Sequence, residues 1–219
     1  MIILYGVSRS RASRPLWLLT EAATPFTQVP VLQANRHTGA NAAWTGLTTA
    51  SPEFLAVNPL GQIPALADGA VVLTESLAIP LYLARKYGKD LGPASDVETA
   101  QMEQWALFAA TSLEGPALEI YYAIADGRDQ TPEGAALVAI GSEKLRRPFG
   151  RLQTHLAAHP YLVGDRFTAA DINTAECARY AQGNVALLAE FPAVKAWLER
   201  CQARPSFKAM WAARLAEPA

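Results

Sequence analysis

The chain has 219 residues, of which 51% are hydrophobic and 18% charged, and its formal net charge is −1. This composition excludes an intrinsically disordered chain, because enough apolar surface is present to offset the entropy of ordering. It also argues against a general nucleic-acid binder, which needs an excess of Lys and Arg. The two cysteines, Cys177 and Cys201, and the three histidines show no metal-ligand or disulfide-scaffold spacing, so no metal site is expected.

The chain begins with MIILYG, an apolar run of strand length. This run lacks the basic start, the longer apolar core and the cleavage site of a signal peptide. Nowhere does the sequence approach the ~20 uninterrupted apolar residues that cross a bilayer. These features predict a cytoplasmic protein that has neither a membrane nor a nucleic acid as a partner.

Up to about residue 87, strand and helix patterns alternate. Strands are predicted at residues 2–5, 26–32, 63–66 and 71–73, and helices at residues 15–23, 51–57 and 77–87. The Asp68-Gly69 pair between the last two strands is a strong hairpin signal. This order predicts a small α/β domain over residues 1–87, with the pattern βαβαββα.

Residues 88–95 carry two glycines and a proline and are predicted to be a linker. Beyond the linker, the apolar spacing is helical throughout, with helices predicted at residues 97–125, 133–157, 169–181, 193–204 and 207–215. Thr168 and Asp171 have the spacing of a capping box, with Phe167 and Ile172 at the flanking staple positions. Residues 96–219 are therefore predicted to form an all-helical domain.

The turn after the first strand is the first candidate site. Pro15 fits one of the first three helical positions, where a missing N–H costs little, so the helix cap falls between Ala12 and Arg14. Ser13 is the expected capping residue. Ser10 lies just before the cap, where its hydroxyl could point toward whatever binds at the positive end of the helix.

A second candidate site combines the segment NPLGQIPAL, residues 58–66, with the strand-to-helix turn at residues 75–76. The Ile63-Pro64 bond is a candidate cis peptide, because the cis form of an X-Pro bond costs only ~0.5–1 kcal/mol. Such a bond can leave the backbone of Ile63 open to pairing with an extended peptide. Glu75 can accept a ligand ammonium and Ser76 can bind a carboxylate, although a plain helix start explains the same pair.

Together, these segments resemble the glutathione S-transferase family, in particular bacterial-type members with a serine-type active site. The resemblance rests on LYG followed by Ser10 and Arg14, on NPLGQIPAL, on LTES with the AI that follows, and on FTAADI in the helical domain. It spans nearly the whole chain in the right order. It implies a thioredoxin-like N-terminal domain, a helical C-terminal domain, glutathione as co-substrate and a homodimer.

The same resemblance implies which residues hold glutathione: Gln62, Ile63, Pro64, Glu75, Ser76 and Arg36. Pro64 would be the cis-proline, and the backbone of Ile63 would pair with the cysteinyl part of the tripeptide. Glu75 and Ser76 would bind the γ-glutamyl ammonium and carboxylate. Gln62 is a weaker candidate, and Arg36 competes with His37 for the glycyl carboxylate.

Ser10 matches the serine that donates a hydrogen bond to the sulfur in the serine-type classes, while Arg11 and Ser13 are alternatives. A free thiol with a pKa near 8.5 is only a few per cent ionised at neutral pH. Lowering that pKa by ~2 units takes about 2.7 kcal/mol of thiolate stabilisation. One charge-assisted hydrogen bond and a helix N-terminus can supply this amount, so the reaction requires no protein nucleophile.

The electrophile pocket is expected between the two domains, lined by side chains from the first part of the helical domain: Trp105, Phe108, Thr111, Ser112 and Tyr121. Ordinary packing between helices explains each of them equally well. Transfer of glutathione to hydrophobic electrophiles is the favoured activity. The open alternatives are a glutathione-dependent disulfide reductase or peroxidase, a dehalogenase, and a non-catalytic binding module of the same fold.

Overall fold

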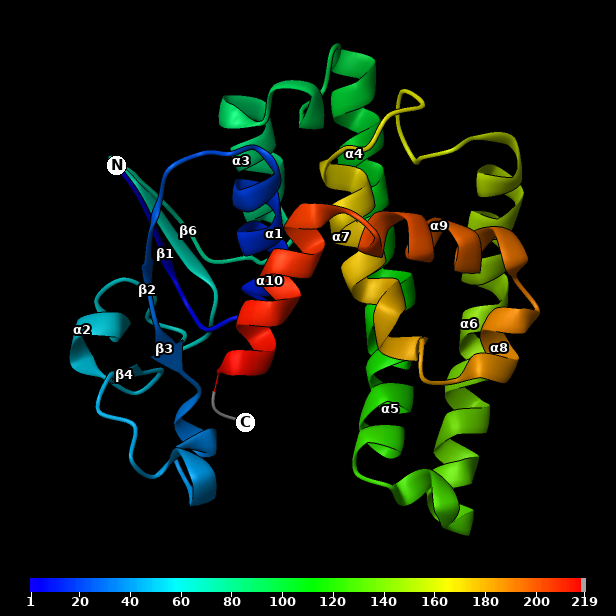
Figure 1. Cartoon of the computed structure of the whole chain (residues 1–219), viewed down its shortest axis with the longest axis horizontal. Coiled ribbons are helices and arrows are strands. Elements are labelled where there is room, and N and C mark those ends of the chain that lie inside the picture. Colours follow the sequence, from blue (N-terminus) through cyan, green and yellow to red (C-terminus); the bar gives the residue numbers. More distant parts are fainter. Residues whose placement is uncertain (218–219) are drawn as a thin grey trace. The chain divides into compact units, whose positions relative to one another are not determined.

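The computed structural model describes residues 1–217, and the chain divides into two compact units. Residues 1–92 and the segment from Arg204 onward form the first unit, while residues 93–203 form the second. The sheet lies in the first unit and the second is built of helices (Figure 1). The predicted combination of an α/β part with an all-helical part is confirmed.

Four strands form the mixed sheet of the first unit, in the order β2-β1-β5-β6. These strands are β1 (Ile2–Tyr5), β2 (Thr27–Val29), β5 (Ala65–Asp68) and β6 (Val71–Leu73). β1 and β2 are parallel, which requires a crossover connection between them, here the helix α1 (Ser13–Glu21). β5 is antiparallel to both β1 and β6, so the hairpin predicted at Asp68-Gly69 is confirmed.

A second, two-stranded sheet shows that the predicted strand at residues 26–32 is interrupted. Pro30, which has no N–H for a strand ladder, separates β2 from β3 (Val31–Leu32). β3 pairs in parallel with β4 (Leu47–Thr48), a strand that the sequence did not predict because two residues are too few to show an alternation.

The helices of the first unit are α1 (Ser13–Glu21), α2 (Pro52–Leu55), α3 (Ala78–Tyr87), the 3-10 turns η1 (Ala34–Arg36), η2 (Gly39–Asn41) and η3 (Lys89–Leu91), and α10 (Pro205–Ala216). α10 lies beside α1 (Figure 1). The rings of Trp17 and Phe207 meet edge to face with centroids 4.8 Å apart, and Trp17 Nε1 donates to Ser206 Oγ at 3.1 Å. The last helix, predicted to belong to a domain of residues 96–219, thus groups with the first unit because it buries its apolar face on α1.

The helices of the second unit are α4 (Asp96–Phe108), the π-helical segment η4 (Ala109–Leu113), α5 (Glu114–Ala125), the 3-10 turn η5 (Arg128–Gln130), α6 (Pro132–Ala158), α7 (Ala169–Ala178), the 3-10 turn η6 (Arg179–Ala181), α8 (Val185–Ala189) and α9 (Pro192–Gln202). The π-helical segment divides what the sequence predicted as one helix over residues 97–125. α8 was not predicted, because its five residues are too few to show a helical period.

The predicted capping box of α7 is confirmed. Asp171 is fully buried and accepts the N–H groups of Thr168 (2.9 Å), Leu162 (3.1 Å) and the Trp197 indole (2.9 Å). Burial raises the pKa of Asp171 to about 6, against the opposing effect of these donors. The carboxyl group of Asp171 thereby connects the start of α7 to α9 and to Leu162, in the segment that precedes α7.

A second buried carboxylate joins the sheet of the first unit to α3. Asp68 Oδ2 accepts Lys86 Nζ (2.7 Å) and the hydroxyls of Tyr82 (2.8 Å) and Tyr87 (2.7 Å). The hydrogen bond from Lys86, followed by that from Tyr87, lowers the pKa of Asp68 to about 2. The carboxylate is therefore bound more strongly in its charged form when the chain is folded.

Asp68→Asn is expected to reduce the free energy of unfolding by about 1–2 kcal/mol at pH 7. The loss is no larger because Lys86 is half-exposed and solvent screens its charge. The folded pKa of about 2 lies below the ordinary value of 3.8, so this stabilisation is present above pH ~4 and is lost as the pH falls through the folded pKa. Urea unfolding from pH 7 to pH 3 should show the difference between wild type and variant shrinking. A difference that stays constant over this range would contradict the assignment.

Candidate active site

Gly6 brings the two sequence-predicted site segments of the first unit together. It follows β1 directly and has a φ of 139°, a conformation that favours glycine. A methyl group at this position would lie 2.9 Å from Ala12 Cβ and 3.4 Å from Ile63 Cβ. The loop that carries Ser10 and the segment that carries Ile63 and Pro64 therefore meet at Gly6, and they can do so only because it has no side chain.

Ser10 is almost fully buried and is held within its own loop. Its Oγ donates to the carbonyl oxygen of Val7 at 2.6 Å and accepts the N–H of Ala12 at 3.0 Å. Ala12, not Ser13, is the N-cap residue of α1, and Ser13 is the first residue of the helix. The prediction that Ser13 caps the helix is wrong, because Ser10 reaches an N–H group at the helix start from the preceding turn.

The Ile63-Pro64 bond is cis, as predicted. The buried Asn58 holds the turn before it: its Nδ2 donates to Gln62 O at 2.7 Å and its Oδ1 accepts the N–H of Leu60 at 3.1 Å. Ile63 lies two residues before the start of β5, and in the described part of the chain no hydrogen bond engages its backbone. Its N–H and C=O are therefore available to an extended ligand.

Arg14 links the N-terminal part of α1 to the turn before α3. Its side chain is fully buried, and its Nη1 donates to Ser76 Oγ at 2.6 Å. Glu75, the neighbouring residue, is exposed. From the sequence, Arg14 was part of the family resemblance only and no role could be predicted for it. A local sequence pattern does not show which distant residue a buried cation contacts.

The remaining predicted residues of the first unit lie at the surface. Arg11, Gln62 and His37 are exposed, and Arg36 is partly exposed at the end of η1. Within residues 1–217, no hydrogen bond or ion pair joins the side chain of Arg36 to Ser10 or to Ile63. Its assignment to the glycyl carboxylate stays a prediction.

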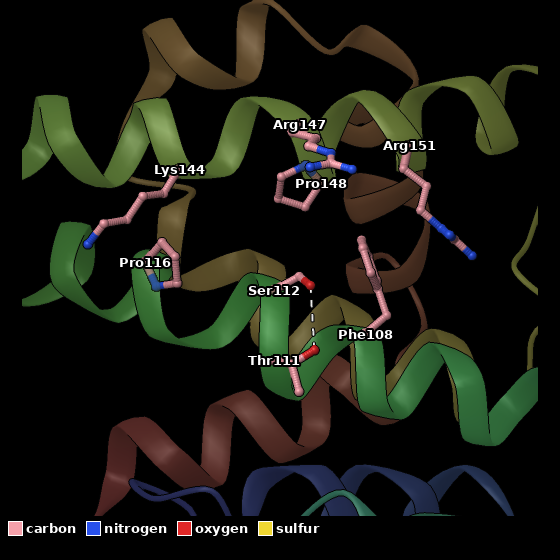
Figure 2. Close-up of a pocket in the computed structure, with 8 residues that line it drawn as sticks. All are labelled: Phe108, Thr111, Ser112, Pro116, Lys144, Arg147, Pro148 and Arg151. Atoms are coloured by element: carbon pink, nitrogen blue, oxygen red, sulfur yellow. Dashed lines mark hydrogen bonds between the residues drawn. The ribbon is translucent and has the colours of Figure 1, made fainter.

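A cavity of about 710 Å³ opens inside the second unit between α6 and the segment from α4 to α5 (Figure 2). Three of the residues predicted for the electrophile pocket, Phe108, Thr111 and Ser112, line this cavity. The other lining residues are Pro116, Lys144, Arg147, Pro148 and Arg151. Three cationic side chains from α6, which were not predicted, thus line the cavity together with the predicted residues.

Two prolines at this cavity interrupt regular helix hydrogen bonding. Pro116 is the third residue of α5 and has no N–H to offer Ser112 O, which fits the π-helical turn that immediately precedes α5. Pro148, inside α6, likewise removes the bond that Lys144 O would accept. The two helices are close about two turns before Pro148, since a methyl group at Gly141 would lie 2.8 Å from Ile120.

Trp105 and Tyr121 do not belong to the residues that line the cavity. Trp105 is buried and packs edge to face on Phe108, with ring centroids 5.4 Å apart, while Arg151 lies over both rings. Tyr121 packs on Tyr180 at 5.5 Å. For these two residues the structure shows packing inside the helical unit.

Comparison with protein families identifies both parts of the chain. The family models described as "Glutathione S-transferase, N-terminal domain" and "Glutathione S-transferase, C-terminal domain" match residues 1–85 and 104–205. The chain belongs to the glutathione S-transferase family. In residues 1–217, no helix is long and apolar enough to span a membrane.

One curated relative and one solved structure match this chain over almost its whole length. "Glutathione S-transferase 3" of Zea mays is 36% identical over 214 residues, covering 94% of this chain and 90% of the relative. The solved structure of glutathione S-transferase III in apo form is 36% identical, with a TM-score of 0.77 and coverage of 100% and 99%. "Elongation factor 1-gamma 3" of Oryza sativa subsp. japonica is 35% identical over 170 residues, but this covers only 39% of that protein. Full-length similarity to transferases supports the transferase activity.

Arg14→Met is expected to weaken glutathione binding about tenfold, because Ser76 loses the buried donor that orients its hydroxyl. A methionine retains much of the side-chain volume, so the fold should persist. Calorimetric titration with glutathione checks the affinity, and Arg128→Met, at an exposed arginine of the second unit, is the matched control. Equal affinities in the two variants would contradict a role for Arg14 in the site.

Proposed function

We propose that this chain transfers glutathione to hydrophobic electrophiles and that Ser10 stabilises the thiolate of the bound tripeptide. The observation that carries the proposal is the placement of the Ser10 hydroxyl at the start of α1, where its oxygen accepts the Ala12 N–H. An alcohol oxygen that already accepts a hydrogen bond is a stronger donor through its own O–H. The Ser10 loop also meets Ile63 and Pro64 at Gly6, which supports a shared binding site.

Binding of the tripeptide would use the groups around this loop. The backbone of Ile63 would pair with the cysteinyl residue as a strand would. The exposed carboxylate of Glu75 would accept the γ-glutamyl ammonium, and Ser76, oriented by Arg14, would donate to the γ-glutamyl carboxylate. Gln62 and Arg36 stay weaker candidates for the rest of the peptide.

Catalysis would begin with a change of partner at Ser10. In this structure the O–H of Ser10 donates to Val7 O, and rotation of the side chain would direct the same proton to the sulfur. The thiol proton would leave to solvent, since the thiolate is the nucleophile. The sulfur would then form a bond to the electrophilic carbon as the leaving group departs with the electron pair.

Ser10→Ala is expected to lower kcat/KM for conjugation about 10- to 100-fold, the loss of one hydrogen bond to a charged group, while glutathione affinity changes little. Steady-state conjugation of an aryl halide and calorimetric binding of glutathione measure the two quantities separately. Ser13→Ala, at a serine three residues away that is also buried, is the matched control. If Ser13→Ala loses as much activity as Ser10→Ala, or Ser10→Ala loses none, the role belongs to Ser13 or Arg11.

Glu75→Gln is expected to weaken glutathione binding about tenfold, because the amide keeps the size of the side chain but removes the charge that attracts the ammonium. The rate at saturating glutathione should change little, since Glu75 does not act on the sulfur. Glu53→Gln, at an exposed carboxylate in the first turn of α2, is the control. Unchanged affinity in Glu75→Gln would remove this assignment.

A non-catalytic binding module is the second candidate, and the elongation factor relative is the observation that favours it. An activity panel separates the candidates. Turnover of an aryl halide supports the transferase; turnover confined to a mixed disulfide or a hydroperoxide supports the reductase or peroxidase; binding without turnover supports the module. Both cysteines are buried in the second unit, in α7 and α9, so a reductase would have to rely on the thiol of glutathione alone.

The electrophile site, the homodimer and the cytoplasmic location stay predictions. The cavity lined by Phe108, Thr111 and Ser112 is one candidate for the electrophile site, and its three cations favour an electrophile that carries a negative charge. The dimer rests on the family alone, and the location rests on the sequence features of the first residues and on the lack of a long apolar stretch.

A further inference from the structure

Arg214 of α10 and Glu217, which directly follows the helix, make four hydrogen bonds with the loop between β1 and α1. Glu217 Oε1 accepts the N–H of Ser8 and Glu217 Oε2 accepts the N–H of Arg9, both at 2.8 Å. Arg214 Nη1 donates to Ser8 O at 2.7 Å, and Arg9 Nε donates to Arg214 O at 2.9 Å. We call these four bonds the 214–217 contact. They give the backbone N–H groups of Ser8 and Arg9 an acceptor each, and they give the carbonyl oxygen of Ser8 a donor.

The residues that this contact holds are the ones inside the Ser10 turn. Ser10 Oγ closes a small ring by donating to Val7 O, and Ser8 and Arg9 are the two residues between those ends. Ser8 is only 2% exposed, so its backbone has little access to water as a replacement partner. A carboxylate that receives two N–H groups forms stronger bonds than a neutral acceptor.

We infer that Glu217 and Arg214 are positioning residues for thiolate stabilisation by Ser10, an inference that rests on the role proposed for Ser10. When the Ser10 hydroxyl turns from Val7 O toward the sulfur, the ring that it closed is opened. The 214–217 contact keeps the peptide groups of Ser8 and Arg9 in place during that exchange. The hydroxyl then reaches the sulfur with an unchanged backbone, and small misplacements of such a group reduce rates strongly.

The charge of Glu217 makes this role distinguishable from direct electrostatic assistance. A negative charge near the sulfur disfavours a thiolate, so removing it by itself would lower the thiol pKa and raise activity. Loss of positioning has the opposite effect, because the hydrogen bond to the thiolate weakens. The direction of the change in thiol pKa therefore separates the two.

The test uses the full-length chain with glutathione, and compares Glu217→Gln and Arg214→Met with wild type. Glutamine retains one acceptor but places an amide donor against the second N–H; methionine removes the donor to Ser8 O. The pKa of the bound thiol is read from the ultraviolet absorbance of the thiolate against pH, and kcat/KM from conjugation of an aryl halide. Glu199→Gln, at an exposed glutamate of α9 that pairs with Lys195, is the matched control.

Both variants are expected to raise the thiol pKa and to lower kcat/KM about tenfold, with the control unchanged. The double variant should lose little beyond the stronger single one, because both act through the same two residues. Glu217→Gln decides the test, because loss of the Arg214 charge alone would also raise the thiol pKa. An unchanged or lowered thiol pKa in Glu217→Gln, with Ser10→Ala inactive in the same assay, would overturn this inference and leave the role of Ser10 intact. Full activity of Ser10→Ala would overturn the proposed role of Ser10 and the inference with it.

Discussion

The close approach at Gly6 is the constraint on which the candidate site depends. β1 is a central strand of the sheet, and its last residue, Tyr5, pairs with Ala65, the first residue of β5. This register alone brings the residue after β1 next to the residue before β5, namely Gly6 next to Pro64. A side chain at Gly6 would force the two apart, so the meeting of the Ser10 loop with Ile63 follows from the register together with one missing methyl group.

A buried cation then fixes the third part of the site. An arginine placed wholly out of water is costly unless its charge is compensated by hydrogen bonds, and Arg14 directs one of them to Ser76. The helix that begins at Ser13 adds the positive end of its dipole to the same region. The helix dipole favours an anion near Ser10, and the Arg14 charge favours one near Ser76, so both ends of the candidate site suit the negative groups of a ligand.

Local chemistry explains which features could be predicted from the sequence. The Asp68-Gly69 hairpin, the cis Ile63-Pro64 bond and the Thr168–Asp171 capping box all depend on residues within a few positions of one another. Each is specified by neighbouring residues, and each was predicted correctly. Ser13 is the exception. Two serines three positions apart could each accept an N–H group at the start of α1, and in the folded turn Ser10 accepts that of Ala12.

The features that the sequence did not predict depend on residues far apart in the chain. The bond from Arg14 to Ser76 spans 62 positions, and nothing near Arg14 indicates its partner. The predicted boundary of the helical domain differs from the observed one for the same reason. α10 has the pattern of any amphipathic helix, and its contacts with α1 and with the loop before α1 assign it to the first unit. Likewise, Phe108 and Ser112 could be predicted as pocket residues, but the cations opposite them come from α6.

The longest of these separations has a consequence for how the active loop forms. The backbone groups of Ser8 and Arg9 form hydrogen bonds with Glu217 and Arg214, which lie more than 200 positions later. Contacts of such sequence separation carry a large loop-closure cost and tend to form after local structure. β1, α1 and the Ser10 turn can therefore be present as local structure before the last helix docks, yet the two residues inside that turn acquire their final partners only when α10 packs on α1. The geometry around the candidate catalytic hydroxyl is in this sense completed by the end of the chain, although every residue proposed to touch glutathione lies within the first 76 residues.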